Sequence, residues 1–170
     1  MPHPAALEID DLLADCDVQR TRGSGPGGQH RNKVETAVRL THRPTGLSVL
    51  ASERRSQEQN RAAAAARLRV KLALTVRRPV GADPGEPIPS ARWSARVKGG
   101  RLSINPSHDD FPALLAEALD HLAADEYDVA VSAQALGVST SQLVKLLRHE
   151  PAGLEQVNRE RKQRGQRTLS

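Results

Sequence analysis

Residues 34–51 read VETAVRLTHRPTGLSVLA, and this stretch decides the fold expected for the first half of the chain. Apolar and polar residues alternate along 34–42 and again along 47–51, which is the period-two pattern of half-buried strands. Between the two runs, Arg43-Pro44-Thr45-Gly46 places a proline and a glycine where they suit a tight turn. We therefore predict a β-hairpin whose apolar face needs a cover.

The segment after the hairpin predicts a helix that supplies this cover. Ser56 followed by Gln59 has the spacing of a capping box, and the residues from 61 to 74 are rich in the helix formers Ala, Arg and Leu. An apolar stripe at three- and four-residue steps can lie on the sheet: Ala62, Ala65, Leu68 and Leu72. With a further strand expected over 13–22, the order is strand, loop, strand, strand, helix. The fold class predicted for this unit is α+β, a small β-sheet with a packed helix.

The loop between the first and second strands has the composition of a segment that approaches another molecule closely. Residues 23–33 read GSGPGGQHRNK, with four glycines among the first six positions and Pro26 stiffening the run. Gln29, a neutral side chain, follows the paired glycines Gly27 and Gly28 and is surrounded by basic residues. Such a loop suits the delivery of one backbone amide and one neutral side chain into an anionic partner.

The positive charge is concentrated in the same part of the chain. The whole chain has a net charge of +5, whereas residues 18–78 hold 14 Lys and Arg against three acids, a surplus of +11. This imbalance favours a polyanionic partner such as RNA. A solvated helix face is the alternative interpretation for the basic residues around the helix. The RNA contacts predicted in this unit are Arg20, Arg22, His30, Arg31, Lys33, Arg54, Arg55 and Arg61.

The second half of the chain changes in composition. Residues 77–106 are rich in Pro and Gly and predict a linker, with a small hairpin of 93–97 and 101–104 around Lys98-Gly99-Gly100. Apolar residues then recur at helical spacing, so 107–152 is predicted to be a small helical domain. With 1–76 as the first domain and 153–170 as a basic tail, this gives four consecutive segments.

The helical domain is expected to contain three helices. The first starts near Phe111 and the second covers Asp128 to Leu136, while Thr140 or Ser141 caps a third that reaches Arg148. Residues 135–143 have the signature of a helix-turn-helix corner, for which DNA binding is one interpretation and a plain helical bundle is the other. His108-Asp109-Asp110 is interpreted as the N-terminal cap of the first helix rather than as a metal site. The cations singled out in the tail are Arg159, Arg161, Lys162 and Arg164, for which a solubilising tail is the alternative to RNA contact.

Several classes of protein are excluded by the composition. The single cysteine, Cys16, precludes an internal disulfide and is expected to be a small buried strand residue. No two histidines stand at metal-ligand spacing, so we predict no metal and no cofactor. The chain begins without the charged and apolar regions of a secretory leader, and nothing later reaches membrane-span length. A soluble, cytoplasmic protein with no membrane partner is expected.

Three ordered blocks of the sequence resemble the GGQ domain of class I peptide chain release factors. They are RGSGPGGQHRNKVETAV at 22–38, HRPTGL at 42–47 and ERRSQEQN at 53–60, within a resemblance that covers about residues 13–75. The resemblance implies the fold of that domain, a target in the peptidyl-transferase centre of the large ribosomal subunit, and hydrolysis of the ester in P-site peptidyl-tRNA. It marks Gly27, Gly28 and Gln29 as the catalytic tripeptide. In that family the glutamine's backbone amide is assigned to the oxyanion and its side chain is often N5-methylated.

The resemblance is to the short, codon-independent members that rescue stalled ribosomes, because no codon-reading domain is expected ahead of residue 13. Those members carry a basic C-terminal tail that enters the mRNA channel of the small subunit, and the tail at 153–170 is the candidate here. The helical segment at 109–148 is additional to that pattern. The alternative function is that of an rRNA- or DNA-binding module that docks without hydrolysing the ester.

Overall fold

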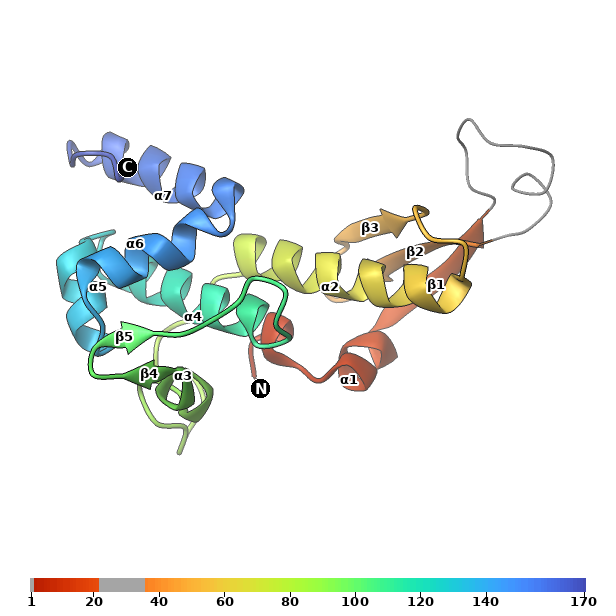
Figure 1. The fold of residues 1–170 in the computed structure, drawn as a ribbon, viewed down its shortest axis with the longest axis horizontal. Coiled ribbons are helices and arrows are strands. Elements are labelled where there is room, and N and C mark those ends of the chain that lie inside the picture. Colours follow the sequence, from red (N-terminus) through yellow and green to blue (C-terminus); the bar gives the residue numbers. More distant parts are fainter. Residues whose placement is uncertain (1, 22–35) are drawn as a thin grey trace. The chain divides into compact units, whose positions relative to one another are not determined.

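The computed structural model describes residues 2–21 and 36–170 (Figure 1). The chain forms two compact units, Leu7–Leu72 and a second that joins the residues up to Ala6 to Ala73–Ser170. The elements of the first unit are α1 (Ile9–Ala14), β1 (Cys16–Thr21), β2 (Ala37–His42), β3 (Ser48–Ala51) and α2 (Gln57–Thr75), whose last residues count with the second unit.

The three strands form one antiparallel sheet in the order β1-β2-β3, as the alternating pattern predicts. The turn between β2 and β3 closes where the proline and glycine stand. The backbone N–H of Gly46 donates to the carbonyl oxygen of His42 at 2.8 Å, and Gly46 has a φ of 71°. A glycine tolerates this left-handed conformation without a steric penalty, so the turn explains the residue.

Helix α2 covers the sheet and confirms the α+β fold class (Figure 1). Arg67 Nη1 donates to the carbonyl oxygen of Leu50 at 2.8 Å, and Lys71 Nζ donates to that of Ser48 at 2.9 Å. Both bonds satisfy carbonyl groups on the edge strand β3. Sheet and helix together bury Val38, Leu40, Ala51, Ala64, Ala65, Leu68 and Leu72.

The predicted stripe on α2 needs one correction. Ala62 is exposed, whereas Asn60 and Ala64 are fully buried. The buried stripe therefore runs Asn60, Ala64, Leu68, Leu72 at steps of four. Sequence periodicity could not place this phase, because Ala62 and Ala64 are equally apolar and the polar Asn60 interrupts the pattern.

The second unit is mostly helical. Its elements are a short 3-10 helix η1 (Pro4–Ala6), α3 (Ala91–Arg96), β4 (Val97–Lys98), β5 (Arg101–Leu102), α4 (Phe111–Ala124), α5 (Val129–Ala135), α6 (Thr140–Arg148) and α7 (Pro151–Gln163). Strands β4 and β5 pair as the expected hairpin around Gly99 and Gly100. The first part of the predicted hairpin, however, is helical, because Ser90 caps α3 by accepting a bond from the Trp93 backbone N–H at 3.1 Å.

Helix α4 forms the centre of this unit. Its residues Leu114, Leu115, Ala118, Leu119 and Leu122 are all buried, as their spacing predicts. Trp93 is also fully buried, and its indole Nε1 donates to the carbonyl oxygen of Leu136 at 2.8 Å. The stretch predicted to be a linker thus contains α3, a buried tryptophan and a hairpin.

The corner between α5 and α6 forms where the helix-turn-helix signature stands. Gly137 has a φ of 65° and ends α5, and the side chain of Ser139 accepts a bond from the Gln142 backbone N–H at 3.3 Å. The cap of α6 is therefore Ser139 rather than the predicted Thr140 or Ser141. Ser139 is the last residue with extended backbone angles, so its hydroxyl reaches the third helical N–H.

The start of α4 also differs from expectation. Asp110 occupies the N-cap position, but its side chain makes no capping bond. Its carboxylate instead accepts from Arg96 Nη2 at 2.6 Å and lies 3.4 Å from Arg92 Nε. The Asp110 carboxylate, which the sequence predicts as a helix cap, therefore forms ion pairs with α3 instead.

Candidate functional site

Strand pairing brings the end of β1, the start of β2 and the end of β3 together at one end of the sheet. The last residue of β1, Thr21, pairs with the first residue of β2, Ala37, and Val38 pairs with Ala51 at the end of β3. The segment 22–35 joins the first two of these strand ends, and the segment 52–56 leads from the third into α2. The two sequence blocks with the most distinctive composition therefore start from the same end of the sheet.

The predicted catalytic residues Gly27, Gly28 and Gln29 lie outside the described residues. The same is true of four predicted RNA contacts: Arg22, His30, Arg31 and Lys33. The structure describes the two strands on which this segment begins and ends, and the groups that hold them.

Asn60 holds the point at which the chain enters β2. Its side chain is fully buried, and its Nδ2 donates to the carbonyl oxygens of Thr36 at 2.7 Å and Arg54 at 2.9 Å. Its Oδ1 accepts from the Arg54 backbone N–H at 2.9 Å. One buried amide therefore fastens three backbone groups from two segments to the first turns of α2, and it satisfies polar groups that would be costly to bury unpaired.

Sequence reasoning did not assign this role to Asn60. A signal was present, because Asn60 stands four residues before Ala64 and eight before Leu68 on the buried stripe. A buried polar side chain in an apolar stripe normally has hydrogen-bond partners. Its partners lie 24 and 6 residues away in the sequence, and only the tertiary fold brings them to the Asn60 side chain.

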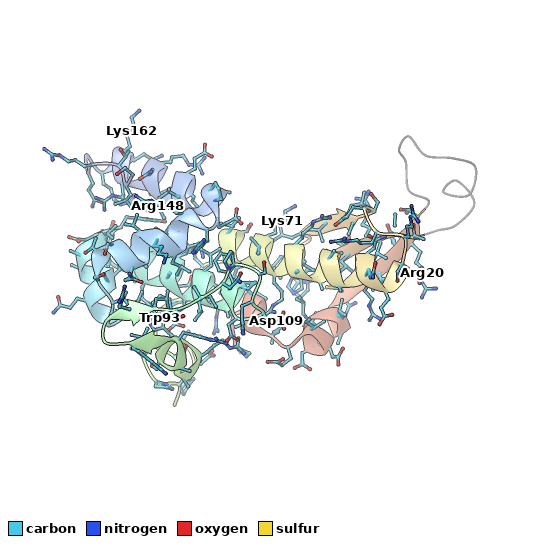
Figure 2. All side chains as sticks on the ribbon, in the orientation of Figure 1. Arg20, Lys71, Trp93, Asp109, Arg148 and Lys162 are labelled. Atoms are coloured by element: carbon cyan, nitrogen blue, oxygen red, sulfur yellow. The ribbon has the colours of Figure 1, made fainter. Side chains whose placement is uncertain are left out.

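The cations predicted to contact RNA are exposed at this end of the sheet. Arg20 precedes the last residue of β1, and Figure 2 shows it at that end of the strand. Arg54 and Arg55 lie in the segment before α2, and Arg61 lies in its first turns. Because Asn60 binds both Arg54 and Thr36, it fixes the backbone that carries Arg54 beside the exit of the segment 22–35. The four described cations thus lie at the end of the sheet where β1 ends and β2 begins.

Other basic side chains of the unit have structural partners. Arg67 forms an ion pair with Glu53. Hydrogen bonds from the Glu53 backbone N–H and then from Arg67 keep the pKa of the Glu53 carboxyl below its usual value. Arg43 donates to Asp17 at 3.3 Å, which fastens the β2–β3 turn to β1. These residues account for part of the positive charge without an external partner.

Two buried groups close to the sheet are uncharged at neutral pH. Burial lowers the pKa of His42, whose Nδ1 shares a hydrogen bond of 2.8 Å with Thr45 Oγ1. Burial raises the pKa of the Cys16 thiol, which confirms the expectation of a small buried strand residue rather than a reactive one.

Of the four cations predicted in the tail, two bind other parts of the helical unit and two extend into solvent. Arg161 Nη1 donates to the carbonyl oxygen of Tyr127, and the Arg164 guanidinium lies 4.8 Å from the centre of the Tyr127 ring. Arg164 also pairs with Glu160 and Glu126. These two cations fasten α7 to the turn after α4. Arg159 and Lys162 are exposed, and Figure 2 shows Lys162 extending away from α7.

Metal ligation has no support within residues 2–21 and 36–170, where no group of three or more His, Cys, Asp or Glu side chains is arranged to hold an ion. Among the helices that the structure describes, none combines the length and the apolar character needed to cross a membrane.

Comparison with known proteins finds similarity to one family over the first half of the chain. Residues 6–83 match the family profile described as "RF-1 domain". The matched segment contains the three-stranded sheet and α2, so the family profile and the α+β unit coincide in the sequence.

Individual relatives agree with the family match. The chain is 50% identical over 72 residues to the protein named "Peptide chain release factor 1" of Maricaulis maris (strain MCS10), an alignment of 42% of this chain and 20% of the relative. It is 33% identical over 150 residues to the protein of the same name from Lactobacillus johnsonii (strain CNCM I-12250 / La1 / NCC 533), covering 86% of this chain and 41% of the relative. For Acidiphilium cryptum (strain JF-5) the identity is 32% over 137 residues, 78% of this chain and 39% of the relative. The chain thus spans between a fifth and two fifths of the length of these relatives.

Proposed function

We propose that this protein hydrolyses the ester of peptidyl-tRNA in the peptidyl-transferase centre of the ribosome and releases the nascent peptide without reading a stop codon. The observation that carries the proposal is the match of residues 6–83 to the RF-1 domain profile, a segment whose sequence contains Gly27-Gly28-Gln29 between β1 and β2. The buried Asn60 supports it, because a catalytic loop must begin and end on rigid structure.

The chemistry proposed for the loop needs few groups. Water adds to the acyl carbon, the bond to the ribose oxygen breaks, and that oxygen leaves with a proton. Charge develops on the carbonyl oxygen, and the backbone N–H of Gln29 is proposed to stabilise it. Gly27 and Gly28 let the backbone approach the ester without a Cβ clash. The Gln29 side chain orients the water, and the vicinal hydroxyl of the tRNA with ribosomal groups transfers the proton.

The partners proposed are the large-subunit rRNA and P-site peptidyl-tRNA. Arg20, Arg54, Arg55 and Arg61 are exposed around the sheet end, and together with Arg22, His30, Arg31 and Lys33 they are proposed to contact rRNA phosphates. The exposed Arg159 and Lys162 suit RNA in the mRNA channel of the small subunit, and Arg161 and Arg164 are proposed to add to that charge.

Release of labelled peptide from ribosomes that carry peptidyl-tRNA tests the proposal. Three complexes are compared: an empty A site, a sense codon in the A site and a stop codon in the A site. We expect release from the empty site that a stop codon does not accelerate. Release that depends on the stop codon would overturn codon independence. Salt-sensitive ribosome binding with no release from any complex would favour a binding module instead.

A further inference from the structure

A second basic region lies in the helical unit, in a groove of about 580 Å³ between the β4–β5 hairpin and α6. One side of the lining has Arg96 at the end of α3 with Lys98 and Arg101 of the hairpin, and the other has Gln142 and Lys145 of α6 with its C-cap residue His149. The three residues from α6 recur at steps of three and four, so they lie along one face of that helix. None of these side chains belongs to the RF-1 domain.

The two walls of the groove are fixed to each other. The Leu102 backbone N–H donates to Gln142 Oε1 at 3.3 Å, and the Ser139 backbone N–H donates to the carbonyl oxygen of Gly100 at 3.3 Å. The side chain of Leu102, in β5, is buried. These hydrogen bonds hold the hairpin against the N-terminal part of α6.

The charge in the groove is uncompensated. No acidic side chain is among the described residues that line it. Arg96 is paired with Asp110, but Lys98, Arg101 and Lys145 are exposed, and in the described part of the chain they have no ion-pair partner. Three cations without counter-charges therefore converge on one concave surface, which raises the local affinity for anions.

Two of these cations repel each other within the hairpin. Lys98 and Arg101 are direct cross-strand partners on the two-residue turn of Gly99 and Gly100. Like charges directly opposite each other destabilise a strand pair. A bound anion would relieve this repulsion.

We propose that the groove binds the phosphate backbone of RNA and gives the protein a second RNA contact, separate from the RF-1 domain. The choice of RNA rests on the proposed function, because a chain that acts on the ribosome meets rRNA, tRNA and mRNA. Binding does not depend on the base sequence of the RNA, because Lys98, Arg101 and Lys145 contact phosphate groups through their charges. The side-chain oxygen Oε1 of Gln142 already accepts a hydrogen bond from the Leu102 backbone N–H.

The test measures the binding of the full chain to a 20-base-pair RNA duplex and to a DNA duplex of the same sequence, by fluorescence anisotropy over a range of salt. Lys145→Gln is compared with Arg148→Gln, which removes one charge from an exposed residue of the same helix that does not line the groove. The triple variant Lys98→Gln/Arg101→Gln/Lys145→Gln amplifies the effect. Lys98→Arg/Lys145→Arg keeps the charge.

For the RNA duplex, Lys145→Gln is expected to reduce the slope of log affinity against log salt by about 0.7–0.9, and the triple variant by about 2–3, with an affinity loss of about tenfold or more. Arg148→Gln and the charge-keeping variant should bind RNA as the unchanged protein does. Equal slopes for Lys145→Gln and Arg148→Gln would overturn the proposal, as would a loss confined to DNA. Because this binding is measured away from the ribosome, its failure is distinguishable from a failure of peptide release.

Discussion

At the scale of single residues, the buried side chain of Asn60 connects two backbone segments to α2. It is one amide that binds three backbone groups, and one of these belongs to Thr36, the first described residue after the segment that contains Gly27-Gly28-Gln29. A residue in this position can influence a reaction without contacting the substrate. We therefore regard Asn60 as a positioning residue.

Asn60→Ala is expected to lower the free energy of unfolding by about 2–4 kcal/mol, because it leaves buried backbone groups unpaired. It should also lower the maximal rate of peptide release at saturating protein, at a temperature where the variant is folded. Chemical denaturation and single-turnover release measure the two effects. A variant that is destabilised but releases peptide at the unchanged maximal rate would show that Asn60 is only structural.

Histidine residues make the fold sensitive to acid. His3 Nδ1 accepts from the Ala5 backbone N–H at 3.0 Å, so its other ring nitrogen carries the proton and lies 3.3 Å from the Val76 carbonyl oxygen. Burial lowers the pKa of His3 to about 4 and also lowers the pKa values of His42 and His121. In each case the folded state favours the neutral ring.

The expected pH dependence follows from these directions. As the pH falls below 6.5, the unfolded chain binds a proton at His3 before the folded chain does, so stability is lost between pH 6.5 and about 4. The contribution of His3 is at most about 3 kcal/mol. His3→Asn keeps an acceptor for Ala5 but does not titrate, so denaturation curves at pH 7 and pH 5 should differ less for it than for the unchanged protein. An identical difference in both would contradict this account.

At the scale of elements, α2 connects the sheet to the segment that carries Arg54 and Arg55. Its buried stripe stabilises the first unit, and its exposed cations Arg67 and Lys71 satisfy carbonyl groups of β3. Packing and positioning can therefore be separated by comparing substitutions on the same helix.

Leu68→Ala should destabilise the first unit by about 2–5 kcal/mol, because Leu68 is fully buried and its truncation leaves a cavity. Ala62→Ser on the exposed side should change stability by less than about 0.5 kcal/mol. Thermal melts measure both. Where folded, Leu68→Ala should keep the maximal release rate that Asn60→Ala loses, so it is the matched control for that variant.

Helix α7 allows a similar separation of charge from packing. Arg159→Gln/Lys162→Gln changes only exposed side chains, so we expect weaker ribosome binding, a smaller salt dependence and an unchanged melting temperature. Pelleting of ribosomes with bound protein at several salt concentrations measures the affinity. Unchanged binding at all of them would show that these tail cations only aid solubility.

Elements with strong periodicity could be predicted from the sequence. The β2–β3 hairpin follows from alternation and the Pro-Thr-Gly turn, and the buried face of α4 follows from its leucine spacing. Helix α3 could not be predicted, because it is six residues long and is held by a bond from Trp93 to Leu136, 43 residues away. The cap at Ser139 could not be predicted, because Ser139, Thr140 and Ser141 all carry hydroxyls that can cap a helix. The partners of Asn60 could not be predicted either, because tertiary contacts leave no periodic signal in the sequence.

At the scale of the whole molecule, the chain combines a segment that matches the RF-1 domain profile with a helical unit, and each carries exposed basic side chains. In the first unit, Asn60 and the exposed cations lie at the end of the sheet where β1 ends and β2 begins. The groove between the hairpin and α6 is built to receive an anion. The proposed hydrolysis and the proposed second RNA contact involve different units, so substitutions should remove them separately.

The most direct test of the central claim is the single-turnover rate of peptide release from ribosomes with peptidyl-tRNA and an empty A site, for the unchanged protein and for Gln29→Ala. Ribosome binding by both proteins is measured in parallel. The account predicts release by the unchanged protein and its loss in Gln29→Ala, at equal binding. Equal release rates for the two proteins, or binding without release by the unchanged protein, would contradict it.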